Sequence, residues 1–418
     1  MACVITAFAL RIGFAGSVDF DPRSAYHFDA TWYDLAALTF ADGRLLRDAA
    51  GVPTAFWPPG YPIALGASYA VFGESLRVAQ VLHAVLAALS CGFVYAFAAR
   101  VLGHSQALVA GWLLALFPGY IFLAPVTLSE NAFVACFASV LWAFGRWNER
   151  FDHELLHWAV FGALIGLATL TRGAASLFLA VPFAIWCLGP GSRRRTGLRT
   201  AAAALGIVLT LAPWTLRNAL VLGSPIAGST SVGMALTWAH SPVSDGSNSL
   251  ATIEYREKLI APFQELPNPE RELASMRFEV ERAFAFSVSH PRREVELMGL
   301  RLFHLFQHDH AGLDWLRPTN APARQSHEIW SQGADRVLAA FADAYYYAIL
   351  ALAGLGAWAV RRRPTAWILP LSVAYIAVLH GVLFVGDPRY HAPLYPVLAL
   401  LAAEGCVRLR DWRRPQSR

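Results

Sequence analysis

The sequence predicts an all-α polytopic membrane protein with about ten transmembrane helices, a helix in the first extracytoplasmic loop and a larger extracytoplasmic insert. Of the 418 residues, 56% are hydrophobic and only 15% are charged, whereas a soluble domain usually carries about 25% charged residues. The apolar residues form runs near the roughly 20 residues that a helix needs to cross a bilayer. Sparse charge between such runs argues against a soluble globular chain.

The first apolar run, residues 2–18, could be a cleaved signal peptide, but it lacks a basic leading region and Arg11 interrupts it. We therefore expect it to be the first transmembrane helix. The segment 58–72 opens with Pro-Pro-Gly-Tyr-Pro and is expected to be re-entrant or interfacial. Nine further spans are expected at 78–102, 106–123, 131–144, 158–171, 174–188, 198–216, 337–360, 366–384 and 392–407.

The basic residues between these spans indicate the orientation of the chain. They form four groups: Arg146 and Arg150; Arg193, Arg194, Arg195 and Arg199; Arg361, Arg362 and Arg363; and Arg408, Arg410, Arg413 and Arg414. Counted along the expected spans, all four groups fall on one side, which the positive-inside rule assigns to the cytoplasm. The net charge of +5 therefore reflects membrane topology and does not indicate a nucleic-acid partner.

The polar segments that remain fall on the extracytoplasmic side. We expect an N-terminal transmembrane module at 1–217 that includes a first outer loop at 19–57, an extracytoplasmic insert or cap at 218–335, and C-terminal helices with a basic tail at 336–418. The insert is long enough to form a small folded unit. The five cysteines lie in apolar runs without a CxxC pair, so they indicate neither a disulfide framework nor a zinc site.

The first outer loop contains a candidate general base. Asp29 and Tyr33 share one helical face with Ala36 and Ala37, which predicts a short helix along the membrane surface that ends near Gly43. Asp34 and Asp42 are interpreted as solvated surface acids. Asp29 is flanked by aromatic residues, and a carboxylate in such a place can take a proton from a reacting hydroxyl.

Other acids offer weaker candidates. Asp19 and Asp21 form a DxD pair, which can bind a divalent metal, although a single DxD is common by chance. Glu130 begins an expected span after Thr127 and Ser129; it is either an acid favoured by the helix dipole or a functional group, since an acid at the membrane edge needs a partner.

Three arginines lie on the outer side, where basic residues should be rare: Arg172, Arg217 and Arg389. Together they suggest a bound anion, because the planar guanidinium donates two hydrogen bonds to a phosphate. The alternative is that each one extends toward lipid headgroups.

The histidines of the insert could bind a metal ion. His304 and His308 have the i, i+4 spacing of a helical zinc pair, with Asp309 and His310 next to them. No third ligand stands at a diagnostic spacing, so we assign no metal site, and a divalent metal is possible but not indicated.

Several short motifs, in this order and topology, resemble the GT-C glycosyltransferases that use polyprenyl-phosphate sugars, in particular the ArnT and protein O-mannosyltransferase superfamily with its bacterial members of unassigned acceptor. The likeness covers nearly the whole chain and is carried by Asp29-Ala-Thr-Trp-Tyr33-Asp-Leu-Ala36 with Gly43-Arg44, Trp57-Pro58-Pro59-Gly60-Tyr61-Pro62, Phe72-Gly73, Leu116-Phe-Pro118, Leu128-Ser129-Glu130, Gly166-Leu-Ala-Thr-Leu-Thr-Arg172, Pro213-Trp214-Thr-Leu-Arg217-Asn218 and Asp387-Pro-Arg389-Tyr390-His391-Ala-Pro393.

The resemblance implies that Asp29 is the catalytic base, because Tyr33, Ala36 and Gly43 follow it at the family's spacing. The family often has an Asp-Glu pair at this point. In this chain Ala30 follows Asp29, so the second acid of the family's pair has no counterpart. The arginines would hold the donor phosphate. Further site candidates are Tyr33, Tyr61, Glu130, Tyr390 and His391, with Asp19 and Asp21.

This family would transfer a sugar with inversion from a polyprenyl-phosphate donor to a glycolipid, polysaccharide or protein hydroxyl outside the cell membrane, with no required cofactor. Two other functions remain open. A lipid-linked-sugar transporter or flippase would place ionisable groups deep within its spans. An O-antigen ligase or polymerase would use outer arginines and a histidine, such as Arg389 and His391. An inactive relative is a third possibility.

Overall fold

The computed structural model describes residues 1–18, 20–23, 28–48, 50–148, 155–189, 192–316 and 332–413. In these ranges the regular structure is helical, with a single isolated bridge between Arg47 and Pro53. The helices are α1 (Ala2–Gly16), α2 (Phe28–Ala41), α3 (Gly60–Phe72), α4 (Leu76–Val101), α5 (His104–Ala115), α6 (Pro118–Phe122), α7 (Glu130–Trp147), α8 (Leu155–Thr171), η1 (Gly173–Ala175), α9 (Ala180–Leu188), α10 (Arg193–Leu222), α11 (Val232–Ala239), α12 (Leu250–Ile260), η2 (Ala261–Phe263), α13 (Glu270–Ser289), α14 (Pro291–Phe306), α15 (Ala311–Leu316), α16 (Gln332–Val360), η3 (Pro364–Trp367), α17 (Ile368–Val378), η4 (Leu379–Leu383), η5 (Pro388–Leu394) and α18 (Tyr395–Arg413).

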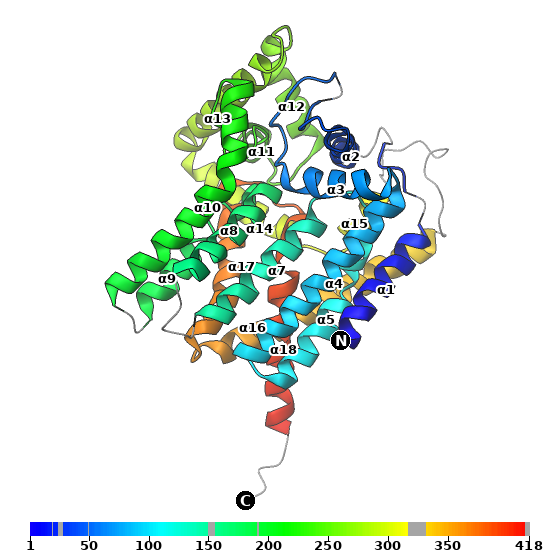
Figure 1. Cartoon of the computed structure of the whole chain (residues 1–418), viewed down its shortest axis with the longest axis vertical. Coiled ribbons are helices and arrows are strands. Elements are labelled where there is room, and N and C mark those ends of the chain that lie inside the picture. The colour runs from blue at the N-terminus through cyan, green and yellow to red at the C-terminus, as the bar shows by residue number, and fades with distance from the viewer. Residues whose placement is uncertain are drawn as a thin grey trace, which may run out of the picture.

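Figure 1 shows two levels. The lower level is a bundle of long helices that includes α4, α5, α7, α8, α10, α16, α17 and α18. Above it lie α2, α3 and the insert helices α11, α12 and α13. As expected, the segment after residue 58 does not join the bundle as an upright span, because α3 lies crosswise to α4 at the upper end (Figure 1).

The prediction of about ten spans is confirmed only in part. Among the described residues, five helices are long and apolar enough to cross a membrane: Leu76–Val101, Arg193–Leu222, Gly333–Val360, Pro364–Leu383 and Pro388–Trp412. Three shorter apolar helices, Ala2–Gly16, Leu155–Thr171 and Gly173–Leu188, correspond to other expected spans.

The expected span at 106–123 is broken. α5 ends at Ala115, and Pro118 begins the short helix α6 after Phe117 has taken an extended conformation. A residue before proline disfavours the helical region, which explains the break. The expected span at 131–144 lies within α7, whose side chains are buried around almost the whole helix.

Arg11, which interrupts the first apolar run, is fully buried in the bundle. Its guanidinium donates to the carbonyl oxygens of Ala7, Leu114 and Ala115 and lies 4.4 Å from the centre of the Tyr120 ring. The last carbonyls of a helix have no partner inside it. Arg11 therefore completes the C-terminal end of α5 and joins α1 to the bundle.

Two of the four arginine groups meet at one buried acid. Glu404 of α18 is fully buried, accepts from Arg408 Nε at 3.0 Å and lies 3.6 Å from Arg363 Nη1. Gln106 also donates to it at 2.9 Å. Arg363 and Arg408 belong to two different arginine groups, so this contact places both groups at the same end of the bundle, as the predicted orientation requires.

Glycines let α8 and α10 cross at backbone distance. A Cβ atom on Gly162 would lie 1.8 Å from the Ala203 carbonyl oxygen, and one on Gly206 would lie 1.9 Å from the Ala159 carbonyl oxygen. Small residues at a membrane helix crossing allow this approach. No side chain fits there without separating the two helices.

We expect Gly206→Ala to destabilise the protein by about 1–3 kcal/mol, the usual cost of overpacking. Gly197→Ala is the matched control, since Gly197 lies on the same helix with open space around it. At such a position alanine should stabilise by roughly 0.5–1 kcal/mol. Thermal unfolding followed by tryptophan fluorescence measures both. Equal shifts of the two midpoints would contradict the close crossing.

Candidate active site

The centre of the candidate site is an ion pair between the first outer loop and the last part of the chain. Asp29 stands in the first turn of α2, and Arg389 belongs to η5. Arg389 Nη1 donates to Asp29 Oδ2 at 2.7 Å across a sequence separation of 360 residues. Only 7% of the Arg389 side chain and 16% of the Asp29 side chain are exposed.

A second ion pair lies beside the first. Glu130 begins α7, and Arg172 follows the end of α8. Arg172 Nη1 lies 2.5 Å from Glu130 Oε1, and Arg389 Nε lies 3.9 Å from the same oxygen. Glu130 therefore links the two pairs into one network of two acids and two arginines, whose formal charges cancel.

The local sequence explains how Arg389 is held. The Asp387 carboxylate accepts from the Arg389 backbone N–H at 2.9 Å, so Asp387 is the N-cap of η5. Pro388 takes the first position, where its fixed φ suits a helix start. The same carboxylate lies 3.8 Å from Arg389 Nε. The Asp-Pro-Arg motif thus forms the turn and contributes a further negative charge beside the guanidinium.

The position of Arg172 depends on the Pro-Pro-Gly-Tyr-Pro segment. A Cβ atom on Gly60 would lie 2.9 Å from the backbone of Leu170 and Thr171. Only glycine allows the start of α3 to touch the end of α8 so closely. The segment therefore supports the residue directly before Arg172.

Two tyrosines surround the network. The Tyr33 hydroxyl donates to Ser129 Oγ at 3.1 Å, and Arg172 Nη1 donates to the same oxygen at 3.2 Å. Burial raises the pKa of Tyr33, so its phenol stays a neutral donor. The ring of Tyr390 lies 5.1 Å from the Arg172 guanidinium and 5.0 Å from that of Arg389, within reach of cation–π attraction.

These groups line a cavity of about 430 Å³, a size that suits a small molecule or part of a larger one. The rest of its wall is mostly apolar or small, apart from three serines, a threonine and a histidine. It is formed by Trp57, Pro58, Thr169, Gly173, Ala174, Ser176, Leu211, Ala227, Gly228, Ser229, Ser231, Val232, Met234, Ala235, Trp238, His380, Phe384, Val385 and Pro393, with Asp29, Tyr33, Glu130, Arg172, Arg389 and Tyr390.

Among the described residues, four predicted site residues do not line this cavity: Arg217, Tyr61, His391 and Asp21. Arg217 donates instead to the backbone carbonyls of Leu45, Leu46 and Thr54, which fastens the first outer loop to α10. Tyr61 is fully buried behind the wall, with its hydroxyl 2.7 Å from His83 Nε2.

His391 is the third. It is fully buried, with Nε2 3.0 Å from Asp309 Oδ1 and Nδ1 2.7 Å from the Leu305 carbonyl oxygen. Arg389, Tyr390 and His391 follow one another in η5, so their side chains point in different directions. His391 faces the protein interior and does not line the cavity.

The other described acids of the first loop do not line the cavity. Asp21 accepts from the backbone N–H of Arg23 in a local turn and does not line the cavity; Asp19 lies outside the described residues. Asp42 is exposed, as expected. The interpretation of Asp34 as a solvated acid is wrong: it is 2% exposed and accepts from Tyr69 and Arg23, each at 2.7 Å. It packs α2 against α3.

The cavity also contains residues that the sequence patterns did not predict: His380 and the part of the insert that includes Ser229, Ser231 and Trp238. His380 Nδ1 lies 2.9 Å from the Val385 carbonyl oxygen, and its ring stacks on Tyr390 with centroids 5.2 Å apart. An ionisable residue inside an expected span is itself a signal of function, and it could have pointed to His380.

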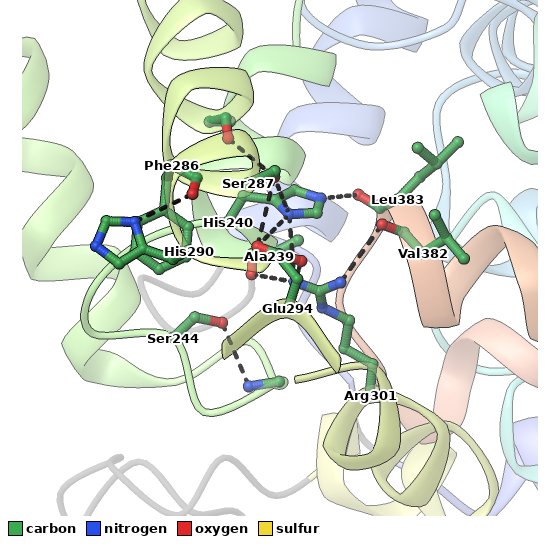
Figure 2. Close-up of polar contacts among 12 residues, drawn as sticks. Ala239, His240, Ser244, Phe286, Ser287, His290, Glu294, Arg301, Val382 and Leu383 are labelled. Atoms are coloured by element: carbon green, nitrogen blue, oxygen red, sulfur yellow. Dashed lines mark hydrogen bonds and ion pairs between the residues drawn. The ribbon is translucent and has the colours of Figure 1, made fainter. Parts of the chain in front are cut away.

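A buried polar cluster fastens the insert to the cavity wall (Figure 2). Arg301 of α14 donates to the carbonyl oxygens of Ala239 and Gly381 at 2.6 and 3.1 Å and pairs with Glu294 at 3.0 Å. His240 Nδ1 lies 2.9 Å from Glu294, and its Nε2 lies 3.1 Å from the Leu383 carbonyl oxygen. The cluster thus holds η4, which contains His380, against the insert.

A model of the dolichyl-phosphate-mannose-protein mannosyltransferase family matches residues 57–216, and a search of curated proteins finds no match. The archaeal oligosaccharyltransferase AglB from Archaeoglobus fulgidus, solved with an inhibitory peptide and a dolichol-phosphate, is similar at a TM-score of 0.55 and 14% identity. The chain has a GT-C fold.

The similarity covers 98% of this chain and 50% of AglB, so the chain spans about half the length of that relative. A second solved structure, ArnT from Cupriavidus metallidurans bound to undecaprenyl phosphate, gives a TM-score of 0.47 at 14% identity, covering 98% of this chain and 78% of ArnT. The family match over residues 57–216 and the likeness to AglB confirm the resemblance that the sequence motifs predicted.

We expect Arg301→Met to destabilise the protein by about 3–5 kcal/mol, because it leaves the Glu294 charge without its buried partner. The double variant Arg301→Met/Glu294→Gln should recover part of that loss. Arg292→Met is the control, an exposed arginine of the same helix. Thermal unfolding of the purified protein measures all three. A single Arg301 variant as stable as the control would show that the cluster does not fasten the insert.

Proposed function

We propose that this chain is a membrane glycosyltransferase that moves a sugar from a polyprenyl-phosphate donor to an acceptor hydroxyl on the extracytoplasmic side. The observation that carries the proposal is the network of Asp29, Arg389, Glu130 and Arg172 in one cavity. Such an arrangement supplies a proton acceptor next to two anion-binding groups. Its occurrence on a GT-C fold supports the reaction class.

In the proposed reaction Asp29 accepts the proton of the acceptor hydroxyl while the oxygen attacks the anomeric carbon. The bond between that carbon and the phosphate oxygen breaks, and polyprenyl phosphate leaves with the bonding electrons. A single displacement of this kind inverts the anomeric centre. No nucleotide or other cofactor is required for it.

Arg172 and Arg389 would stabilise the negative charge that grows on the leaving phosphate. Each guanidinium has five N–H donors, so it can keep its carboxylate partner and still donate to a phosphate. Arg389 contacts Asp29 directly. It would therefore set the position of the base relative to the leaving group, which is the geometric requirement of a displacement.

The form of the cavity supports an amphiphilic donor. Four charged groups provide a polar region, and residues such as Trp238, Val232, Met234 and Phe384 provide apolar wall. AglB was solved with a dolichol-phosphate, and the matching family model is named for dolichyl-phosphate mannose. The bilayer would deliver the prenyl chain. The acceptor would be a glycolipid, a polysaccharide or a protein, and the insert would cap the acceptor side.

The positions of the charged residues favour this reaction over a transporter. Glu130 is the first residue of α7, Arg172 follows the last residue of α8, and Arg389 lies at the start of the Pro388–Trp412 helix. A transporter binds its substrate with groups near the middle of its spans. Charges at helix ends suit chemistry at the membrane surface.

We expect Asp29→Asn to lower sugar transfer by about 10²- to 10⁴-fold, the usual contribution of a general base. The measurement uses full-length protein in lipid nanodiscs with a panel of radiolabelled polyprenyl-phosphate sugars. Transfer to water or to added membrane acceptors is followed, and donor binding is measured in parallel. Asp42→Asn is the control, since Asp42 is an exposed acid of the same loop.

Donor binding retained with transfer lost in Asp29→Asn alone would establish the class of enzyme and its base. Equal transfer by wild type and Asp29→Asn would remove Asp29 from the mechanism. An absence of donor binding in the wild type would favour the transporter.

A separate prediction concerns the arginines. Arg172→Gln, combined with Glu130→Gln to avoid a buried unpaired acid, should weaken binding of the polyprenyl-phosphate donor about tenfold or more, since hydrogen bonds to charged groups contribute about 1.5–3 kcal/mol. Arg217→Gln should leave donor affinity unchanged, because Arg217 binds backbone carbonyls outside the cavity. Titration of each variant in nanodiscs compares them. Equal weakening by Arg217→Gln would place that residue in the donor site.

A further inference from the structure

A group of metal-ligating side chains lies where the insert returns to the bundle, apart from the cavity of Asp29. His308 and His310 belong to the segment between α14 and α15, and Asp343 lies on α16. Each of the three offers one ligand atom, and these atoms lie within 4.8 Å of one another. None of the three lines the cavity described above.

His310 is already arranged as a metal ligand. Its Nδ1 lies 2.9 Å from both carboxylate oxygens of Asp343. When neutral His310 carries its proton on Nε2, the lone pair of Nδ1 points to the same place as the Asp343 carboxylate, so both can bind one ion. Asp343 is held in turn by the backbone N–H of Asp309, which donates to Oδ1 at 2.9 Å.

His308 contributes an independent observation. Its ring stacks on that of His310, with centroids 4.0 Å apart and planes 14° from parallel. Its Nδ1 is buried and has no hydrogen-bond partner among the described residues. A buried polar atom without a partner is uncommon in a folded protein and requires an explanation. A bound cation would supply the missing contact.

The charges of the group also suit a divalent cation. Asp314 of α15 lies 3.9 Å from His310 Nε2 through its Oδ2, and 58% of its side chain is exposed. Asp314 and Asp343 together carry two negative charges when ionised, and the two imidazoles can bind as neutral ligands. Two carboxylates and two neutral imidazoles balance a charge of +2. The exposure of Asp314 leaves a path by which an ion can enter.

From this geometry we infer a binding site for a zinc-like divalent cation formed by His308, His310 and Asp343, with Asp314 beside it. Nitrogen and oxygen ligands in this mixture suit zinc. Ligand atoms around a tetrahedral zinc lie about 3.4 Å apart, given bonds of about 2.0–2.1 Å. Small side-chain rotations would bring the three atoms to that spacing.

The ion would connect the end of the insert to α16. Trp315 follows Asp314 directly, and the Arg389 guanidinium lies 4.9 Å from the Trp315 ring. A cation here would thus also steady the helix that packs against the candidate active site. This role is structural and does not depend on the proposed transfer reaction.

The test is direct binding of Zn²⁺ to chelator-treated, full-length protein in nanodiscs, by calorimetry and metal analysis. The wild type should bind one Zn²⁺ per chain at this site. His308→Ala and Asp343→Asn should each weaken binding at least about tenfold. His304→Ala is the matched control: it stands in the last turn of α14, outside the group, and should bind as the wild type does.

Thermal unfolding in the presence of chelator checks that each variant is folded. For the wild type, X-ray absorption of the zinc-loaded protein gives a second measurement that needs no variant, and it should show two imidazole ligands. Absence of stoichiometric Zn²⁺ binding, binding that survives both cluster variants, or a zinc spectrum without imidazole would each overturn the inference.

Discussion

The contact between Arg389 and Asp29 is the interaction on which the candidate site depends. It is a nearly buried ion pair between the first outer loop and the start of the last long helix. Burying one such charge alone is costly, and removing either partner leaves the other uncompensated. The pair therefore requires both ends of the chain to meet at one place, and Glu130 with Arg172 extends it into a neutral network.

The surrounding helices are packed so that this meeting can occur. Gly162 and Gly206 bring α8 against α10, and Gly60 brings the start of α3 against the end of α8. Arg172 follows α8 directly, so its reach toward Glu130 depends on these approaches. Each contact is between backbones, where an added methyl group would move a whole helix rather than one side chain.

The insert closes the remaining side of the cavity. Its residues Ser229, Ser231 and Trp238 form part of the wall, and its Arg301 cluster is bonded to the carbonyls of η4. The insert is therefore joined to the element that contains His380. The charged network itself belongs to the bundle and the first outer loop.

The sequence by itself determined the helical membrane class, the short helix at Asp29, and the candidate status of Glu130, Arg172, Arg389 and Tyr390. Those inferences rest on hydrophobic run length, on arginine placement and on local motifs, which depend only on neighbouring residues.

Tertiary structure alone decided which candidates share a cavity. Arg217 and Arg389 are equally conspicuous in the sequence, but Arg217 faces the carbonyls of the first loop and Arg389 faces Asp29. His391, two residues from Arg389, turns inward to Asp309. The grouping of His308 and His310 with Asp343 likewise follows from packing between distant segments. The direction of a side chain at a helix end depends on how helices far apart in sequence pack against each other. Local sequence patterns do not predict that packing.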